Sequence, residues 1–118
     1  PRLAGTHQRH NALLAIAMLR HQDRLEVPEA ALRAAMGWAE WPARLQRLGP
    51  GPLLNRLPKG SELWLDGGHN PAAARAVADF FRGRLPAERP FHVVAGLLAN
   101  KDAPGLIRPF RGMRIAWH

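Results

Sequence analysis

The stretch Leu63-Trp64-Leu65-Asp66-Gly67-Gly68-His69-Asn70-Pro71 decides the fold that this sequence predicts. An apolar run that ends in an acid is typical of a short buried strand, and the two glycines permit a tight turn. Asn70 and Pro71 are favoured at the N-cap and at the first position of a helix. We therefore expect a strand, a turn and a helix that place Asp66 and His69 at the carboxyl edge of a sheet, where open α/β folds bind ligands.

Hydrophobic periodicity extends this pattern along the chain. Two helices are predicted at the amino-terminal end, one that begins after Thr6 as its N-cap and one that starts at Pro28 and ends at Gly37. The expected apolar face of the first helix comprises Leu13, Ile16 and Ala17, widened by Leu14 and Met18. Further on, strands are expected over 44–48, 63–65, 91–97 and 113–117, with helices from residue 71 and over 103–110. The continuous apolar run over 91–97 is typical of a strand covered on both faces. The helix from residue 71 is expected to bury Ala74, Val77, Ala78 and Phe81. Strands that alternate with helices predict an α/β layer with mainly parallel pairing. The expected domain boundary lies near residues 37–43.

The size and composition of the chain limit its class. Its 118 residues suffice for one modest domain, or for a small domain and part of another. The absence of cysteine excludes disulfides and thiolate metal sites. The sequence has no apolar run of the roughly 18 residues that suggest a membrane span, and its first residues lack the layout of a signal peptide. We expect a cytoplasmic protein that does not bind membranes.

The positive charge of the chain raises the question of nucleic acid. Seventeen basic residues against nine acidic ones give a net charge of +8. These basic residues are mostly arginines, scattered from Arg2 to Arg114, without a block or an interleaved aromatic platform. That distribution does not match a nucleic-acid footprint, so nucleic acid is not an expected partner. A basic surface that faces a polyanionic small substrate is the preferred interpretation.

Several common catalytic motifs are missing. Lys59-Gly60-Ser61 superficially resembles the end of a phosphate-binding loop, but no glycine stands among the four residues before it. The sequence also lacks a dinucleotide glycine fingerprint, zinc-ligand spacing and a convincing serine nucleophile. These absences exclude the corresponding chemistries from this stretch of chain.

Four residues carry candidate chemistry, and each has a plain structural alternative. The carboxylate of Asp66 can accept a hydrogen bond either from a ribose hydroxyl or from the N–H groups of a local turn. His69 either donates to a phosphate near the helix start or stabilises the turn. Asn11, four residues after His7, offers the donor and acceptor that an adenine edge requires, or belongs to a solvated patch. Arg44 is either a planar cation for a base or phosphate, or one surface arginine of many.

Taken in order, four segments resemble a known family. They are His7-Gln8-x-x-Asn11-Ala12, Trp41-Pro42-Ala43-Arg44-Leu45-Gln46, Leu65-Asp66-Gly67-Gly68-His69-Asn70-Pro71, and Gly96 followed by Asn100-Lys101-Asp102. The ordered set resembles the carboxyl-terminal part of the folylpolyglutamate synthase/dihydrofolate synthase family, within the wider Mur ligase group. The resemblance covers nearly the whole chain.

This resemblance implies an ATP-dependent amide ligase. ATP, with Mg²⁺, would phosphorylate the carboxylate of dihydropteroate or a reduced folate, and the amine of L-glutamate would attack the acyl phosphate. Residues 1–40 would form the helical end of a central ATPase domain. Residues 41–118 would form an incomplete Rossmann-like carboxyl-terminal domain, with a mainly parallel sheet and flanking helices.

The same resemblance implies roles for individual residues. Asn11 would contact adenine, Arg44 the nucleotide and Asp66 the ribose region, whereas His69 would lie near the phosphates. Lys101 and Asp102 match a family loop that faces the substrate cleft. The phosphate loop and magnesium ligands of the family are expected before residue 1, so we expect no metal ligands in this chain and no activity from it alone. The full-length parent would be a monomer.

Two departures from the family pattern stand out. Ala43 replaces the usual glycine, and Asn100 replaces an aspartate. Two alternatives remain for the function. One is a fragment of a cell-wall Mur ligase, and the other is a non-catalytic basic binding module.

Overall fold

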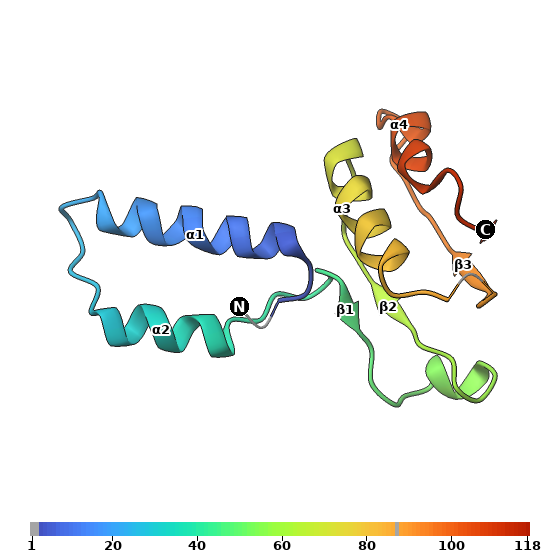
Figure 1. Cartoon of the computed structure of the whole chain (residues 1–118), viewed down its shortest axis with the longest axis horizontal. Helices are drawn as coiled ribbons and strands as arrows, with labels where there is room; N and C mark the ends of the chain where they lie inside the picture. The colour runs from blue at the N-terminus through green and yellow to red at the C-terminus, as the bar shows by residue number, and fades with distance from the viewer. Residues whose placement is uncertain (1–2, 87) are drawn as a thin grey trace. The chain divides into compact units, whose positions relative to one another are not determined.

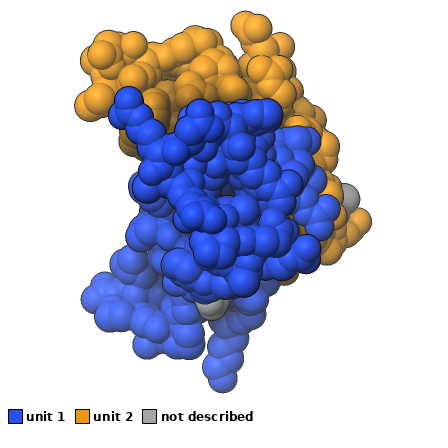
Figure 2. Space-filling view, turned by 90° about the vertical axis from the view of Figure 1, so that its left-hand side faces the viewer, with its two compact units in different colours: residues 1–67 blue, residues 68–118 orange. Residues whose placement is uncertain are grey.

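A computed structural model of the chain describes residues 3–86 and 88–118. The chain divides into two compact units, unit 1 over residues 1–67 and unit 2 over residues 68–118, which Figure 2 colours blue and orange. Helices and short strands occur in both units, so the α/β class is confirmed. Over the residues described, no helix has the length and apolar character needed to cross a membrane.

Unit 1 begins with a helical hairpin (Figure 1). Its helices are α1 (Thr6–Arg20) and α2 (Glu29–Trp38), and an ion pair of 2.6 Å between Arg20 and Glu29 joins them. Both predicted helices are therefore confirmed. The predicted N-cap is wrong, because Gly5 occupies that position with φ 97° and Thr6 is already helical. The second helix ends at Trp38, one residue beyond the predicted Gly37.

The hairpin leaves most of its apolar side chains exposed. Leu13, Leu14 and Met18 form the predicted apolar face of α1, yet their exposed fractions are 63%, 61% and 65%. The buried residue of α1 is Gln8, and that of α2 is Leu32. The predicted face therefore exists on the helix, but unit 1 does not cover it.

A two-stranded sheet follows the hairpin in unit 1. Strand β1 (Gln46–Arg47) pairs with β2 (Trp64–Leu65), and the 3-10 helix η1 (Leu54–Arg56) lies between them in the chain. The pairing is antiparallel, with Gln46 opposite Leu65. The expectation of parallel pairing is wrong here, because a turn-rich connection without a crossover helix returns the chain beside itself in the opposite direction.

Unit 2 contains helix α3 (Pro71–Arg82), strand β3 (Phe91–Val93), helix α4 (Ala103–Ile107), the 3-10 helix η2 (Arg108–Phe110) and strand β4 (Ile115–Trp117). The pairing of β3 with β4 is parallel, as predicted, because α4 and η2 form the crossover between them. In the described parts of the chain, the expected single sheet is thus two separate two-stranded sheets.

The strand predicted over 91–97 is shorter than expected. It ends at Val93, and the next residue, Val94, is 84% exposed. The apolar run had predicted a strand covered on both faces. That prediction is wrong, because His92 within β3 is exposed and so is Val94 directly after it.

The core of unit 2 forms where α3 meets η2. Ala74, Ala78 and Phe110 are buried there, and five partly buried apolar residues pack against them: Val77, Phe91, Leu106, Met113 and Ile115. The predicted inward face of α3 is confirmed, with Ala74, Ala78 and Phe81 buried. Asn70 is confirmed as the N-cap, since its Oδ1 accepts a hydrogen bond of 2.9 Å from the N–H of Ala73.

Candidate functional site

The turn at residues 43–45 has the most unusual backbone in unit 1. Ala43 and Leu45 have φ values of 56° and 44°, a left-handed conformation that non-glycine residues seldom adopt. Such residues persist only where neighbouring structure holds them, and they gather at functional sites. The turn also explains why β1 is shorter than predicted, since a strand requires extended backbone at these positions.

The end of β2 holds this turn. Asp66 Oδ2 accepts a hydrogen bond of 2.8 Å from the N–H of Leu45. The N–H of Gly67 donates to the carbonyl oxygen of Ala43 at 2.9 Å. From within the turn, Gln46 Oε1 accepts from the N–H of Ala43 at 3.0 Å. The structural alternative considered for Asp66, a hydrogen bond to an N–H group of a local turn, is therefore present.

Arg44 lies between the two left-handed residues and is exposed to solvent. Its Nη1 donates to the carbonyl oxygen of Ala43 at 3.1 Å. A Cβ added at Gly67 would lie 3.1 Å from that same Nη1 atom, so the glycine gives the guanidinium room beside the end of β2. The turn thus presents a planar cation next to the carboxylate-bearing end of a strand.

The start of α1 lies against the same turn. A Cβ added at Gly5 would lie 3.2 Å from Leu45 Cδ1. The buried side chain of Gln8 links two polar neighbours: its Nε2 lies 3.1 Å from His7 Nε2, and its Oε1 accepts from Asn11 Nδ2 at 3.3 Å. Asn11 itself is exposed. Its Oδ1 faces no hydrogen-bond donor among residues 3–86 and 88–118, so the acceptor remains for solvent or a ligand.

The sequence did not reveal the left-handed backbone at residue 43. An alanine at this position gives no local indication of a positive φ, because its Cβ disfavours that conformation. With a φ of 56°, Ala43 nevertheless adopts the conformation that glycine accepts most easily. The glycine of the family pattern therefore indicated the positive φ at this position, whereas the alanine of this chain did not. The role of Gln46 as a partner of the turn was also not anticipated.

We predict that Ala43→Gly stabilises unit 1. Glycine relieves about 1–2 kcal/mol of left-handed strain, and its greater freedom in the unfolded chain offsets about half of that gain. The free energy of unfolding, measured by urea denaturation, should rise by about 0.5–1 kcal/mol. The control is Ala34→Gly at an exposed position of α2, which should lower it by about 1 kcal/mol. A loss of stability at residue 43 as large as that at residue 34 would contradict the prediction.

In unit 2 the predicted site residues gather at the amino ends of α3 and α4. Asp102 is the N-cap of α4, with Oδ1 accepting from the N–H of Gly105 at 2.9 Å. A Cβ added at Gly105 would lie 2.8 Å from Pro71 Cγ, so the first turn of α4 touches the first residue of α3. His69 is exposed just before α3, and Lys101 is partly buried just before α4. The structure therefore brings the segments of His69, Lys101 and Asp102 to one end of unit 2.

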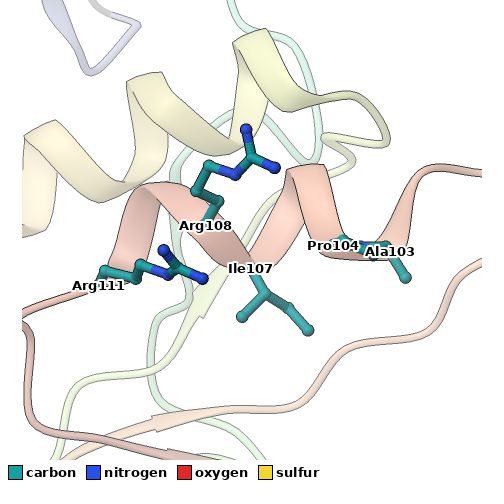
Figure 3. Close-up of a pocket in the computed structure, with 5 residues that line it drawn as sticks. All are labelled: Ala103, Pro104, Ile107, Arg108 and Arg111. Carbon is teal, nitrogen blue, oxygen red and sulfur yellow. The ribbon is translucent and has the colours of Figure 1, made fainter.

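An open depression on α4 was not predicted from the sequence. Its volume is about 370 Å³. Figure 3 shows the residues that line it: Ala103, Pro104, Ile107, Arg108 and Arg111. None of the predicted site residues lines this depression. The sequence offered only a weak signal for it, namely two arginines three residues apart that follow a short apolar helix.

No group of three or more histidine, cysteine, aspartate or glutamate side chains is arranged to hold a metal ion within residues 3–86 and 88–118. The prediction that magnesium ligands lie outside this chain therefore stays a prediction. The roles predicted for the candidate residues in binding adenine, ribose, phosphate and substrate also stay predictions.

Comparison with known proteins finds relatives of this chain among named enzymes. No protein-family model matches the chain. The dihydrofolate synthase/folylpolyglutamate synthase of Bacillus subtilis is 29% identical over 119 residues, which is 98% of this chain and 25% of that protein. The corresponding protein of Mycobacterium tuberculosis is 30% identical over 112 residues, or 89% of this chain and 20% of that protein.

A solved structure agrees with these relatives. The M. tuberculosis folylpolyglutamate synthase complexed with ADP and AMPPCP matches 98% of this chain and 24% of its own chain, with 26% identity and a TM-score of 0.74. The chain thus spans about a quarter of the B. subtilis relative's length.

Proposed function

Because this chain is related, over nearly its whole length, to the carboxyl-terminal part of the folylpolyglutamate synthase/dihydrofolate synthase family, we propose that it is part of an ATP-dependent ligase. The enzyme would add L-glutamate to dihydropteroate or a reduced folate through an acyl phosphate. It would be cytoplasmic and monomeric. The relatives' names and the ordered sequence motifs support this proposal over a cell-wall ligase.

One observation carries the proposal for this chain: Asp66 holds a left-handed turn that presents Arg44. Phosphoryl transfer depends on positioning and on neutralising the charge of phosphate oxygens. An exposed guanidinium on a fixed turn suits both tasks, because its planar donors match phosphate and its face can stack on a base. The solved relative that contains ADP and AMPPCP supports a nucleotide as the ligand.

Further groups, each described within its own unit, complete the nucleotide proposal. The free acceptor of Asn11 and its second N–H match the edge of adenine. The carboxylate of Asp66 would accept a hydrogen bond from a ribose hydroxyl. In unit 2, His69 precedes a twelve-residue helix whose amino end attracts anions, so we assign it to the phosphates. Lys101 and Asp102 are assigned to the substrate side.

The metal and the remaining phosphate contacts would come from outside this chain. Mg²⁺, when bound, neutralises charge on the ATP phosphates. We propose that its ligands and the phosphate loop belong to the ATPase domain, of which residues 1–40 would be the helical end. Residues 41–118 would belong to a Rossmann-like domain with a mainly parallel sheet, which the parallel β3–β4 pair supports. The two compact units of the structure meet in the chain between residues 67 and 68, rather than at the proposed domain boundary between residues 40 and 41.

The nucleotide role is tested by titrating ADP into the 118-residue chain and following its amide resonances. We expect Arg44→Ala to weaken ADP binding about tenfold or more, because a hydrogen bond to a charged group contributes about 1.5–3 kcal/mol. The matched control is Arg56→Ala, an exposed arginine of η1 in the same unit. An equal loss for both arginines, or no saturable binding at all, would remove Arg44 from the proposed site.

A second assay tests the fragment proposal. With ATP, Mg²⁺, glutamate and dihydropteroate or tetrahydrofolate, the chain alone should form no glutamylated product. Measurable product would show that this chain contains a complete catalytic site, contrary to the proposal.

A further inference from the structure

Two histidines meet at the parallel sheet of unit 2, and neither has a role in the nucleotide or substrate positions assigned above. His92 is the central residue of β3, and His118 directly follows β4. Their rings are stacked, with centroids 5.4 Å apart and an interplanar angle of 18°. Nδ1 of His92 lies 3.1 Å from Nε2 of His118. The two imidazoles therefore turn one nitrogen each toward the other.

The sheet backbone fixes this approach. The N–H of His118 donates to the carbonyl oxygen of Val93 at 2.9 Å, and the carbonyl oxygen of His118 accepts from the N–H of Ala95 at 3.1 Å. His118 therefore continues the parallel ladder, and Figure 1 shows the carboxyl-terminal end beside β3. Side chains held by a hydrogen-bonded ladder lose less freedom when a ligand joins them.

The nitrogen separation matches the spacing in a metal complex. Zinc binds imidazole nitrogens at about 2.0–2.1 Å, so two nitrogens on one tetrahedral ion lie about 3.3 Å apart. Two adjacent nitrogens on an octahedral ion at the same bond length lie about 2.9 Å apart. The observed 3.1 Å falls between these values. A metal ion can thus replace the proton that the two rings otherwise share, once each exposed ring turns so that the lone pair of its nitrogen points at the ion.

We propose that His92 and His118 form a two-imidazole site for a divalent transition metal ion of the Ni²⁺, Cu²⁺ and Zn²⁺ class. Imidazole suits these ions, whereas Mg²⁺ and Ca²⁺ prefer oxygen ligands. Both side chains are exposed, so the remaining coordination positions are open to water or to an anionic ligand. The site is independent of the proposed ligase function, because neither histidine belongs to the nucleotide or substrate positions.

The test is calorimetric titration of the 118-residue chain with NiCl₂, CuCl₂, ZnCl₂ and MgCl₂ in separate experiments. We expect one bound ion for the three transition metals, tightest for Cu²⁺, and no binding of Mg²⁺. His92→Ala and His118→Ala should each weaken metal binding more than about tenfold. Losing a group that only orients a metal ligand already weakens binding by about that factor, and each variant removes a ligand itself. The matched control is His21→Ala, at an exposed histidine that follows α1, which should bind as the unchanged chain does.

The other histidines provide the outcome that would overturn the proposal. His7 and His10 lie three residues apart on α1, a spacing that can also hold a metal ion. If His7→Ala abolishes binding and His92→Ala does not, the proposed site is wrong. Cu²⁺-induced broadening of the His92 and His118 ring resonances in the unchanged chain provides a second measurement, which does not depend on the folding of any variant. Broadening confined to other residues would also reject the site.

Discussion

Replacing Phe110 with alanine is expected to lower the free energy of unfolding of unit 2 by about 3 kcal/mol or more. Its side chain is buried between Ala74 and Ala78, and these two residues are too small to fill the resulting cavity. The Phe110 ring also packs edge-on against Trp117, with centroids 5.4 Å apart. Because unit 2 is small, a loss of this size is expected to unfold much of it at room temperature.

Urea denaturation followed by resolved NMR resonances of unit 2 measures this loss. The control is Leu98→Ala, because Leu98 is 70% exposed and its truncation should change stability by less than about 0.5 kcal/mol. The experiment tests the contact between Phe110 and α3, which are distant from each other in the sequence. A Phe110→Ala variant as stable as the Leu98→Ala variant would show that η2 does not close the core.

Replacing Asp66 with alanine is expected to release the turn at residues 43–45. The N–H of Leu45 would lose a charged acceptor at 2.8 Å, a change that costs about 1.5–3 kcal/mol. The left-handed backbone of Ala43 and Leu45 would then lack one of the contacts that hold it. Unit 1 should unfold at lower urea concentration, and the amide resonances of residues 43–46 should shift more than those of α2.

Two variants distinguish the loss of the Asp66–Leu45 hydrogen bond from the loss of a negative charge. Asp66→Asn keeps a carbonyl oxygen that can accept from Leu45, so most of the stability should return. Asp23→Ala removes an exposed carboxylate from the loop between α1 and α2 and should leave the turn unchanged. If Asp23→Ala and Asp66→Ala lower stability equally, the effect is due to net charge and the assigned hydrogen bond is not important.

Local signals in the sequence predicted α3 well. Asn70, Pro71 and the apolar spacing from Ala74 to Phe81 all act within one helix, and the structure confirms the cap and the buried face. The strands were less predictable, because their ends depend on partners far away in the chain. An apolar run over 91–97 cannot show that the strand ends at Val93.

The sequence named candidate site residues, whose roles stay predictions, but it did not predict the backbone that holds them. Family motifs pointed to Arg44 and Asp66, and the structure shows them at one turn. The left-handed conformations of Ala43 and Leu45 were not expected, since neither residue type favours a positive φ. Those conformations depend on a carboxylate and a glycine that follow some twenty residues later, which local propensity cannot reveal.

The bond between Asp66 and the Leu45 amide joins residues 21 positions apart. It therefore closes the ends of the whole segment that contains β1, η1 and β2. An amide that is bonded in this way exchanges its hydrogen with solvent only when the closure opens. The exchange rate of one proton, that of Leu45, is thus a direct measure of how often this segment of unit 1 comes apart in the folded protein.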